Sequence, residues 1–399
     1  MLFHEGRVRI LIQEDTFYRD TWVEIDLDAI AYNVRELRKR VHADNKIIAV
    51  VKANGYGHGA LQIAKEALQS GADCLAVAFL DEAIHLRKNG ITAPILVLGA
   101  SRPRDVAIAI KYKVTLTVYH IDWLEDAIQF LNKDAHVAIH LKLDTGMGRI
   151  GLRKEQEIQQ VEELLANHPN IVVEGVFTHF ATADEKNSIY FEKQIQRFKE
   201  LLAAFSKLPA IVHCSNSAAS LLYPDLQYNA IRMGISMYGL TPSLEIESDL
   251  PYSLKEAFSL RTKLVQVKKL NKGDRVSYGA TYEAEKEEWI GTLPIGYADG
   301  WLRKLQGQEV LVEGKRMPIV GRICMDQCMV RLPYYLEPGT QITLIGKQKD
   351  EEISVNEIAT KLDTINYEVT CMISARVPRI YKKNGVFEET ENPLISEME

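Results

Sequence analysis

The sequence has few cysteines, no long apolar run and no excess of positive charge, and each shortage excludes a class of protein. Five cysteines among 399 residues are too few, and odd in number, for a disulfide framework. Cys324 and Cys328 share a face of one predicted strand, but no CxxC pair or nearby histidine completes a metal site, so we interpret the cysteines as buried thiols. No stretch approaches the roughly 20 apolar residues of a membrane helix. The net charge of −6 argues against a nucleic-acid partner.

The N-terminal residues also lack the pattern of a secretory signal. Residues 1–15, MLFHEGRVRILIQED, scatter charged side chains among apolar ones, whereas a signal peptide has an uninterrupted apolar region. Together with the reduced cysteines, this predicts a cytoplasmic protein.

Apolar runs alternate with amphipathic stretches between residues 46 and about 240. Eight such units are typical of a (β/α)8 barrel of the TIM type. A ninth predicted strand, residues 21–27, has no slot in a closed eight-strand barrel, and we assign it to pairing with a second domain. The eight barrel strands are predicted at 46–51, 74–79, 94–99, 115–120, 137–144, 172–180, 211–216 and 230–235.

The pattern changes after Pro251. Short apolar segments separated by glycine, proline and charged turns predict strands, and only residues 351–362 have a helical pattern. The sequence therefore predicts an α/β protein of two domains, a barrel over residues 1–251 and a mostly antiparallel β-domain over residues 252–399.

Lys52 follows the first predicted barrel strand and precedes a segment with three glycines, Gly55, Gly57 and Gly59. Because barrel chemistry lies at the carboxyl ends of the strands, this lysine is expected at the mouth of the barrel. Partial burial there would lower its pKa and free the amine for Schiff-base chemistry. A surface lysine that ends a strand explains this segment alone equally well.

The seventh and eighth predicted strands end where barrels commonly bind phosphate. Asn216 or Ser217 is placed as the N-cap of a short helix, whose backbone N–H groups suit a dianion, and Gly234 offers a bare amide. Each feature alone is more often an ordinary cap or turn. In combination with Lys52 they favour a phosphorylated aldehyde cofactor.

Three further residues stay open when they are judged by residue type and spacing. His179 ends the sixth predicted strand between phenylalanines, where a core histidine is the common case. Arg149 could bind a carboxylate with both guanidinium nitrogens or form a salt bridge with Asp144. Tyr278 lies beside a glycine, as many exposed turn tyrosines do.

Several strings nevertheless occur in order between about residues 20 and 380: VVKANGYGHG, KLDTGMGRIG, THFATADE, HCSNSAAS, RMGISMYGL, VSYGATY, IGYADG, GRICMDQCM and NYEV. Together they resemble the motif set of the bacterial alanine racemases. These are enzymes that use pyridoxal 5′-phosphate (PLP) to interconvert L- and D-alanine and so supply D-alanine for peptidoglycan. The resemblance implies a head-to-tail homodimer in which each active site is completed by the partner's β-domain.

The resemblance also implies roles for individual residues. Lys52 matches the lysine that binds PLP as a Schiff base and removes the α-proton of D-alanine. Tyr278 matches the base for L-alanine, and Arg232, held by His179, matches the partner of the pyridine nitrogen. The other matches are cofactor contacts at Tyr56, Asn216, Ser217, Gly234, Ile235 and Tyr367, contacts to the substrate carboxylate at Arg149 and Met325, an inner gate at Tyr297 and a carbamylated lysine at Lys142.

Two positions depart from the motif set, and other functions compete with the implied one. Gly55 and Ser215 stand where the family usually has alanine, and both are small. The rival functions are a racemase of another amino acid, a decarboxylase on the same barrel, a PLP carrier without catalysis and a barrel hydrolase without cofactor. A decarboxylase would be expected to have a carboxylate where Arg232 stands, and a carrier would lack the second domain.

Overall fold

The computed structural model describes residues 17–132 and 135–395, so residues 1–15, on which the argument about a secretory signal rests, lie outside the described residues. The chain divides into two compact units. The barrel unit comprises Leu27–Ala257, and the β-unit combines the residues up to Asp26 with those from Phe258 onward.

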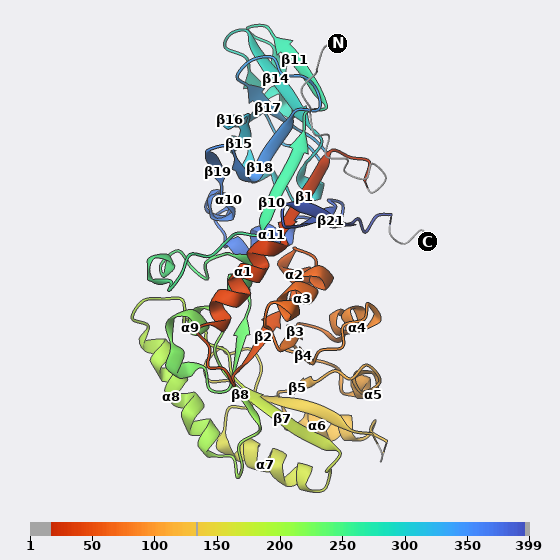
Figure 1. Cartoon of the computed structure of the whole chain (residues 1–399), viewed down its shortest axis with the longest axis vertical. Coiled ribbons are helices and arrows are strands. Elements are labelled where there is room, and N and C mark those ends of the chain that lie inside the picture. Colours follow the sequence, from red (N-terminus) through yellow and green to blue (C-terminus); the bar gives the residue numbers. More distant parts are fainter. Residues whose placement is uncertain (1–16, 133–134, 396–399) are drawn as a thin grey trace, which may run out of the picture. The chain divides into compact units, whose positions relative to one another are not determined.

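Eight parallel strands form the centre of the barrel unit (Figure 1). They follow the order β4-β3-β2-β9-β8-β7-β6-β5, and a parallel bridge between Leu96 and Thr115 joins the two ends of this order. The expected fold class is confirmed. The strands are β2 (Lys46–Val50), β3 (Cys74–Val77), β4 (Ile95–Val97), β5 (Leu116–Val118), β6 (Val137–Lys142), β7 (Ile171–Phe177), β8 (Ile211–His213) and β9 (Ala230–Met233).

Most residues of these strands are apolar because one face lines the barrel interior and the other packs under helices. Ile47–Val50 of β2, for example, are all buried. Each helix buries an apolar stripe, as α8 does with Phe191, Phe198 and Leu201. The helices are α1 (Leu27–Arg38), α2 (Lys52–Tyr56), α3 (Ala60–Gln69), α4 (Leu80–Lys88), α5 (Val106–Lys111), α6 (Ile121–Ile128), α7 (Glu155–Ala166), α8 (Ile189–Ala203) and α9 (Ser217–Leu222).

The β-unit is built on one large sheet. Its first strand, β1 (Thr21–Asp26), pairs antiparallel with β10 (Phe258–Lys263) and parallel with β20 (Arg379–Lys383). The other strand pairs of this sheet in the described residues are antiparallel. The remaining strands are β11 (Gln266–Leu270), β14 (Glu288–Leu293), β15 (Glu309–Val312), β16 (Lys315–Val320), β17 (Cys328–Leu332), β18 (Gln341–Gln348), β19 (Glu351–Ile353) and β21 (Val386–Glu391), and a separate hairpin joins β12 (Arg275–Val276) to β13 (Tyr282–Glu283).

The single helix predicted for the β-unit is only partly right. Residues Glu351–Ile353 pair with β18 as β19, and the helix α10 (Val355–Leu362) begins after Ser354, whose hydroxyl accepts the N–H of Glu357. A second helix, α11 (Asn366–Met372), was not predicted. It has seven residues and no side-chain cap, so neither periodicity nor a capping residue indicates it.

The cysteines differ in part from the prediction. Cys74, Cys214 and Cys328 are buried, but Cys371 is exposed and Cys324 is half-buried in the loop before β17, so the prediction is wrong for these two. In the described part of the chain, no helix is long and apolar enough to cross a membrane.

Candidate active site

Lys52 begins α2, a turn directly after β2 whose backbone is left-handed. Ala53, Asn54 and Gly55 have φ angles of 52°, 51° and 60°, and Tyr56 follows with 52°. A left-handed helical conformation costs a non-glycine residue roughly 1–2 kcal/mol. Such a conformation persists only where the surroundings impose it, and this is common at functional sites.

Hydrogen bonds hold this turn in place. The N–H of Gly55 donates to the carbonyl of Val51 (2.9 Å), and the N–H of Gly57 donates to that of Ala53 (3.0 Å). The turn brings the ring of Tyr56 to 4.8 Å from that of Tyr238 and to 5.9 Å from Lys52 Nζ. The strained turn therefore fixes Lys52 and Tyr56 next to each other.

Hydroxyl and N–H donors converge where β8 and β9 end. Asn216 is the N-cap of α9 and accepts the N–H of Ala219 (3.1 Å), so it is the capping residue of the pair that the sequence left open. Ser217 Oγ accepts the N–H groups of Gly234 (2.9 Å) and Ser236 (3.3 Å). A methyl group on Gly234 would lie 3.0 Å from Tyr56 Oη and 3.6 Å from Ser217 Oγ, so glycine leaves this space open. Ile235 begins the next helical turn and is buried.

Arg232, on β9, is a buried cation with 3% exposure. Its Nη1 donates to His213 Nδ1 (2.7 Å) and to the carbonyl of His213 (3.3 Å). Its Nη2 donates to the carbonyls of Thr178 (2.8 Å) and Cys214 (2.9 Å) and lies 3.3 Å from His179 Nδ1. Burial lowers the pKa of Arg232 to about 10, so the guanidinium stays protonated at neutral pH.

His179 and Lys142 lie in the same positively charged surroundings. Burial, and after it the charge of Arg232, lowers the pKa of each well below its ordinary value. Lys142 Nζ lies 4.4 Å from the centre of the Phe177 ring. Among the described residues no ion pair with Lys142 is present, and its lowered pKa favours the neutral form of this buried amine.

Arg149 is exposed in the loop after β6. The carboxylate of Asp144 lies 3.7 Å from Arg153 Nε and accepts the N–H groups of Gly146 and Gly148. The salt bridge from Arg149 to Asp144, one of the two possibilities that the sequence allowed, is absent from the described residues.

In the β-unit, Tyr297 and Met325 lie on two loops joined by hydrogen bonds. The N–H of Tyr297 donates to the carbonyl of Cys324 (3.0 Å), and the N–H of Ala298 donates to that of Met325 (3.0 Å). Met325 is 53% exposed.

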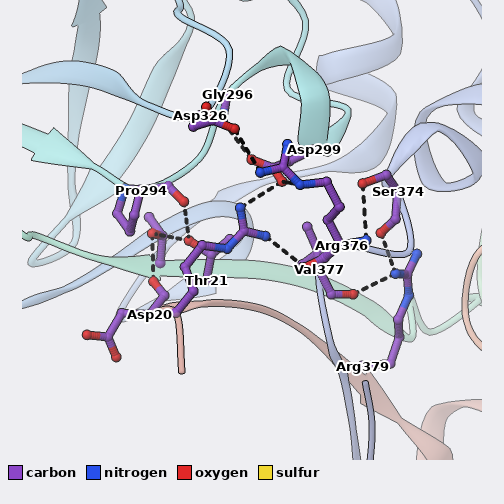
Figure 2. A network of polar contacts seen from close by, with 12 residues as sticks. Asp20, Thr21, Pro294, Gly296, Asp299, Asp326, Ser374, Arg376, Val377 and Arg379 are labelled. Carbon is purple, nitrogen blue, oxygen red and sulfur yellow. Dashed lines mark hydrogen bonds and ion pairs between the residues drawn. The ribbon is translucent and has the colours of Figure 1, made fainter. Parts of the chain in front are cut away.

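A buried carboxylate braces these loops, as Figure 2 shows. Asp299 accepts Arg19 Nη1 (2.7 Å) and the N–H of Gly296 (3.0 Å), and it lies 3.7 Å from Arg376 Nε. Arg376 in turn binds Asp326 (2.7 Å), which is next to Met325.

The other two predicted residues of the β-unit stand on separate elements. Tyr278 lies in the turn between β12 and β13 and is 72% exposed. The preceding Ser277, with a φ of 73°, donates its hydroxyl to the carbonyl of Arg322 (2.6 Å). Tyr367 lies in the first turn of α11 and is half-buried.

The predicted residues thus form one group in the barrel unit and a looser set in the β-unit. Sequence reasoning missed two residues. Ser236 donates its N–H to the same Ser217 hydroxyl oxygen as Gly234 does, and His213 forms a hydrogen bond with Arg232. The order RMGIS could have indicated Ser236, because its N–H lies one turn into the segment that begins at Gly234. A single histidine in a strand gives no such signal.

Comparison with known proteins assigns the family. The family models for the alanine racemase N-terminal and C-terminal domains match residues 25–242 and 257–381. This chain belongs to the alanine racemase family. It is 59% identical over 380 residues to the alanine racemase of Geobacillus kaustophilus, which covers 95% of this chain and 99% of that protein.

Solved structures agree in fold. The alanine racemase of Bacillus anthracis with bound L-Ala-P has a TM-score of 0.92 at 52% identity, covering 95% of this chain and 99% of that one. A histidine racemase from Leuconostoc mesenteroides has a TM-score of 0.87 at 31% identity, covering 92% and 99%. Membership confirms the expected enzyme class, a PLP-dependent racemase and thus an isomerase.

Proposed function

We propose that this chain interconverts L- and D-alanine with PLP bound in the barrel unit. The observation that carries the proposal is the convergence of Tyr56, Ser217 and the N–H groups of Gly234 and Ser236 beside the strained Lys52 turn. Hydroxyls and amides of this kind suit a phosphate dianion, and Gly234 leaves room for it. An amine and an always-charged guanidinium nearby, Lys52 and Arg232, complete a set of donors that fits a phosphorylated aldehyde with a pyridine ring.

The residues that would hold PLP are those implied by the resemblance. Lys52 would bind it covalently, and Arg232, braced by His179, would face the ring nitrogen. When bound, PLP supplies an electron sink that acidifies the hydrogen on the α-carbon of the amino acid. The remaining contacts are assigned to Tyr56, Asn216, Ser217, Gly234, Ile235 and Tyr367.

Racemisation requires a proton to leave one face of the α-carbon and another to arrive on the opposite face. In the D-to-L direction Lys52 accepts the α-proton and Tyr278 donates a proton to the opposite face. In the L-to-D direction Tyr278 is the base and Lys52 is the acid. Lysine and tyrosine have ordinary pKa values of about 10.4 and 10, so the site must favour their basic forms.

Tyr278 would come from the partner subunit of a homodimer. The 72% exposure of its side chain in the single chain suits a residue that a second copy covers. Met325, 53% exposed, would join Arg149 at the substrate carboxylate in the same assembly.

Lys142 would carry a carbamate. The lowered pKa of Lys142 favours the neutral amine, which is the form that reacts with carbon dioxide. The product is an anion, which would orient the guanidinium of Arg149 and offset the charge of Arg232. Within a cell the enzyme would act in the cytoplasm and supply D-alanine for the cell wall.

Chiral analysis of the products tests the substrate. The enzyme with PLP is incubated separately with L-alanine, L-serine, L-histidine and L-lysine, and both enantiomers are quantified. We expect D-alanine to form fastest. If another amino acid racemises faster, that amino acid is the substrate and the proposal is wrong. Release of carbon dioxide would indicate a decarboxylase instead. If none of the four amino acids reacts, a PLP carrier without catalysis is favoured.

A further inference from the structure

Arg232 is a buried cation, and no carboxylate of the described residues is in direct contact with it. Its five polar contacts with described residues are three backbone carbonyls and the imidazoles of His213 and His179. A buried charge is usually paired, so the nearest anion that is linked to Arg232 through hydrogen bonds is the group that can compensate its charge.

That anion is Glu174, two imidazoles away. His213 accepts Arg232 Nη1 at its Nδ1 (2.7 Å), and its Nε2 lies 2.9 Å from His140 Nδ1. His140 Nε2 lies 3.5 Å from Glu174 Oε2. Glu174 lines a small cavity together with Lys46, the first residue of β2, at the amino ends of the strands and thus opposite Lys52.

The two ends of this hydrogen-bonded series, the guanidinium of Arg232 and the carboxylate of Glu174, allow one arrangement of protons on the two imidazoles between them. A guanidinium only donates hydrogen bonds and an ionised carboxylate only accepts them. His213 must therefore accept at Nδ1 and donate from Nε2, and His140 must do the same. Each imidazole is neutral and protonated on Nε2, because a second proton on His213 would point at the N–H of Arg232.

The backbone and packing of β7 make room for the two imidazoles of this hydrogen-bonded series. Strand β7 has a bulge: Ile139 pairs with Val173 and His140 with Gly175, so Glu174 is the extra residue. Bulges redirect side chains near functional sites. A methyl group on Gly175 would lie 2.5 Å from His140 Cε1, so glycine makes room for the imidazole. The ring of His213 stacks on Phe177 at 4.7 Å and 4°.

We propose that Glu174 and His140 are positioning residues which, through His213, hold the guanidinium of Arg232 in the orientation that the cofactor ring requires. The proposal rests on the proposed function for the role of Arg232, and the proton arrangement stands apart from it. Burial lowers the pKa of His213 and of His140, and the hydrogen bond from His140 lowers the pKa of Glu174, all in the direction of this arrangement.

Neutron diffraction of the deuterium-exchanged wild-type holoenzyme tests the proton arrangement. We expect a deuteron on Nε2 of both His213 and His140 and none on Nδ1 of either. A deuteron on His213 Nδ1 would overturn the proposal. An enzyme that racemises no alanine would contradict the proposed function but would leave this result unchanged.

Titration of the apoenzyme with PLP tests the positioning role. Glu174→Gln keeps an acceptor but removes the charge, and we expect the dissociation constant of PLP to rise threefold to tenfold, a factor of the size expected for one weakened hydrogen bond. Glu174→Asp, which keeps the carboxylate, should recover part of the affinity. The matched control is Glu155→Gln, which removes a carboxylate bound to Arg197 at the start of α7. If Glu174→Gln binds PLP within twofold of this control, the positioning role is wrong.

Discussion

Replacing Arg232 with lysine separates the charge of this residue from its shape. Arg232→Lys keeps the cation but removes the planar guanidinium, whose Nη1 and Nη2 reach different acceptors. The short contacts are those to His213 Nδ1 (2.7 Å), the Thr178 carbonyl (2.8 Å) and the Cys214 carbonyl (2.9 Å). A single ammonium cannot reach both sides, so about two buried acceptors lose their donor.

The expected loss of stability follows from that count. A buried polar group without a partner costs about 1–3 kcal/mol, so Arg232→Lys should lower the free energy of unfolding by about 2–6 kcal/mol. Urea denaturation of the apoenzyme measures this without any contribution from the cofactor. Arg197→Lys is the control, because Arg197 contacts Glu155 (2.6 Å) and Glu200 (3.0 Å) at the surface, and such pairs contribute at most about 1 kcal/mol. Equal denaturation midpoints for the two variants would refute the reasoning.

Three further predictions concern the same buried region. Arg232→Glu should slow racemisation and raise the fraction of turnovers that end in transamination, because a carboxylate facing the cofactor ring favours protonation of its nitrogen; a pyruvate assay measures that fraction, and an unchanged fraction contradicts the role. Apoenzyme equilibrated with 13C-bicarbonate should give a carbamate NMR signal that Lys142→Met lacks, and identical spectra would count against carbamylation. Stability should fall as the pH drops below about 6.5, by up to about 1.4 kcal/mol per pH unit for each buried histidine, since the lowered pKa values of His213 and His179 leave the unfolded chain binding more protons. Urea midpoints between pH 7 and 5 test this, and a flat profile would show that the histidines are not held neutral.

The barrel could be predicted because most residues of its strands are buried, on one face in the barrel interior and on the other under helices, and so form largely apolar runs. Segments such as KIIAVV and VAIHLKLD correspond to β2 and β6, although the strands end earlier than the runs do. The runs continue beyond the strands because the loops at the carboxyl ends are also buried, as Val51 and Leu143 are.

Parts of the site could not be predicted from patterns. The left-handed turn after Lys52 depends on backbone hydrogen bonds, and Ala53 gives no local sign of it, although asparagine and glycine at Asn54 and Gly55 tolerate this conformation. The hydrogen-bonded series from Arg232 to Glu174 depends on a bulge in β7. The bulge shifts the pairing register between β6 and β7, and this register cannot be derived from the sequence. Helix α11 is short and uncapped, so the location of Tyr367 on a helix appears only in the fold.

The central claim, that Lys52 of one subunit and Tyr278 of its partner act on the same substrate, is tested most directly by mixing two inactive variants. Lys52→Ala and Tyr278→Phe homodimers each lack one base in both sites, whereas a hybrid dimer has one site with both bases and one with neither. After subunit exchange in an equal mixture, half of the dimers are hybrids, so about a quarter of the wild-type rate should return. If exchange is demonstrated by mass spectrometry and the mixture stays as inactive as its components, the two residues do not share a site.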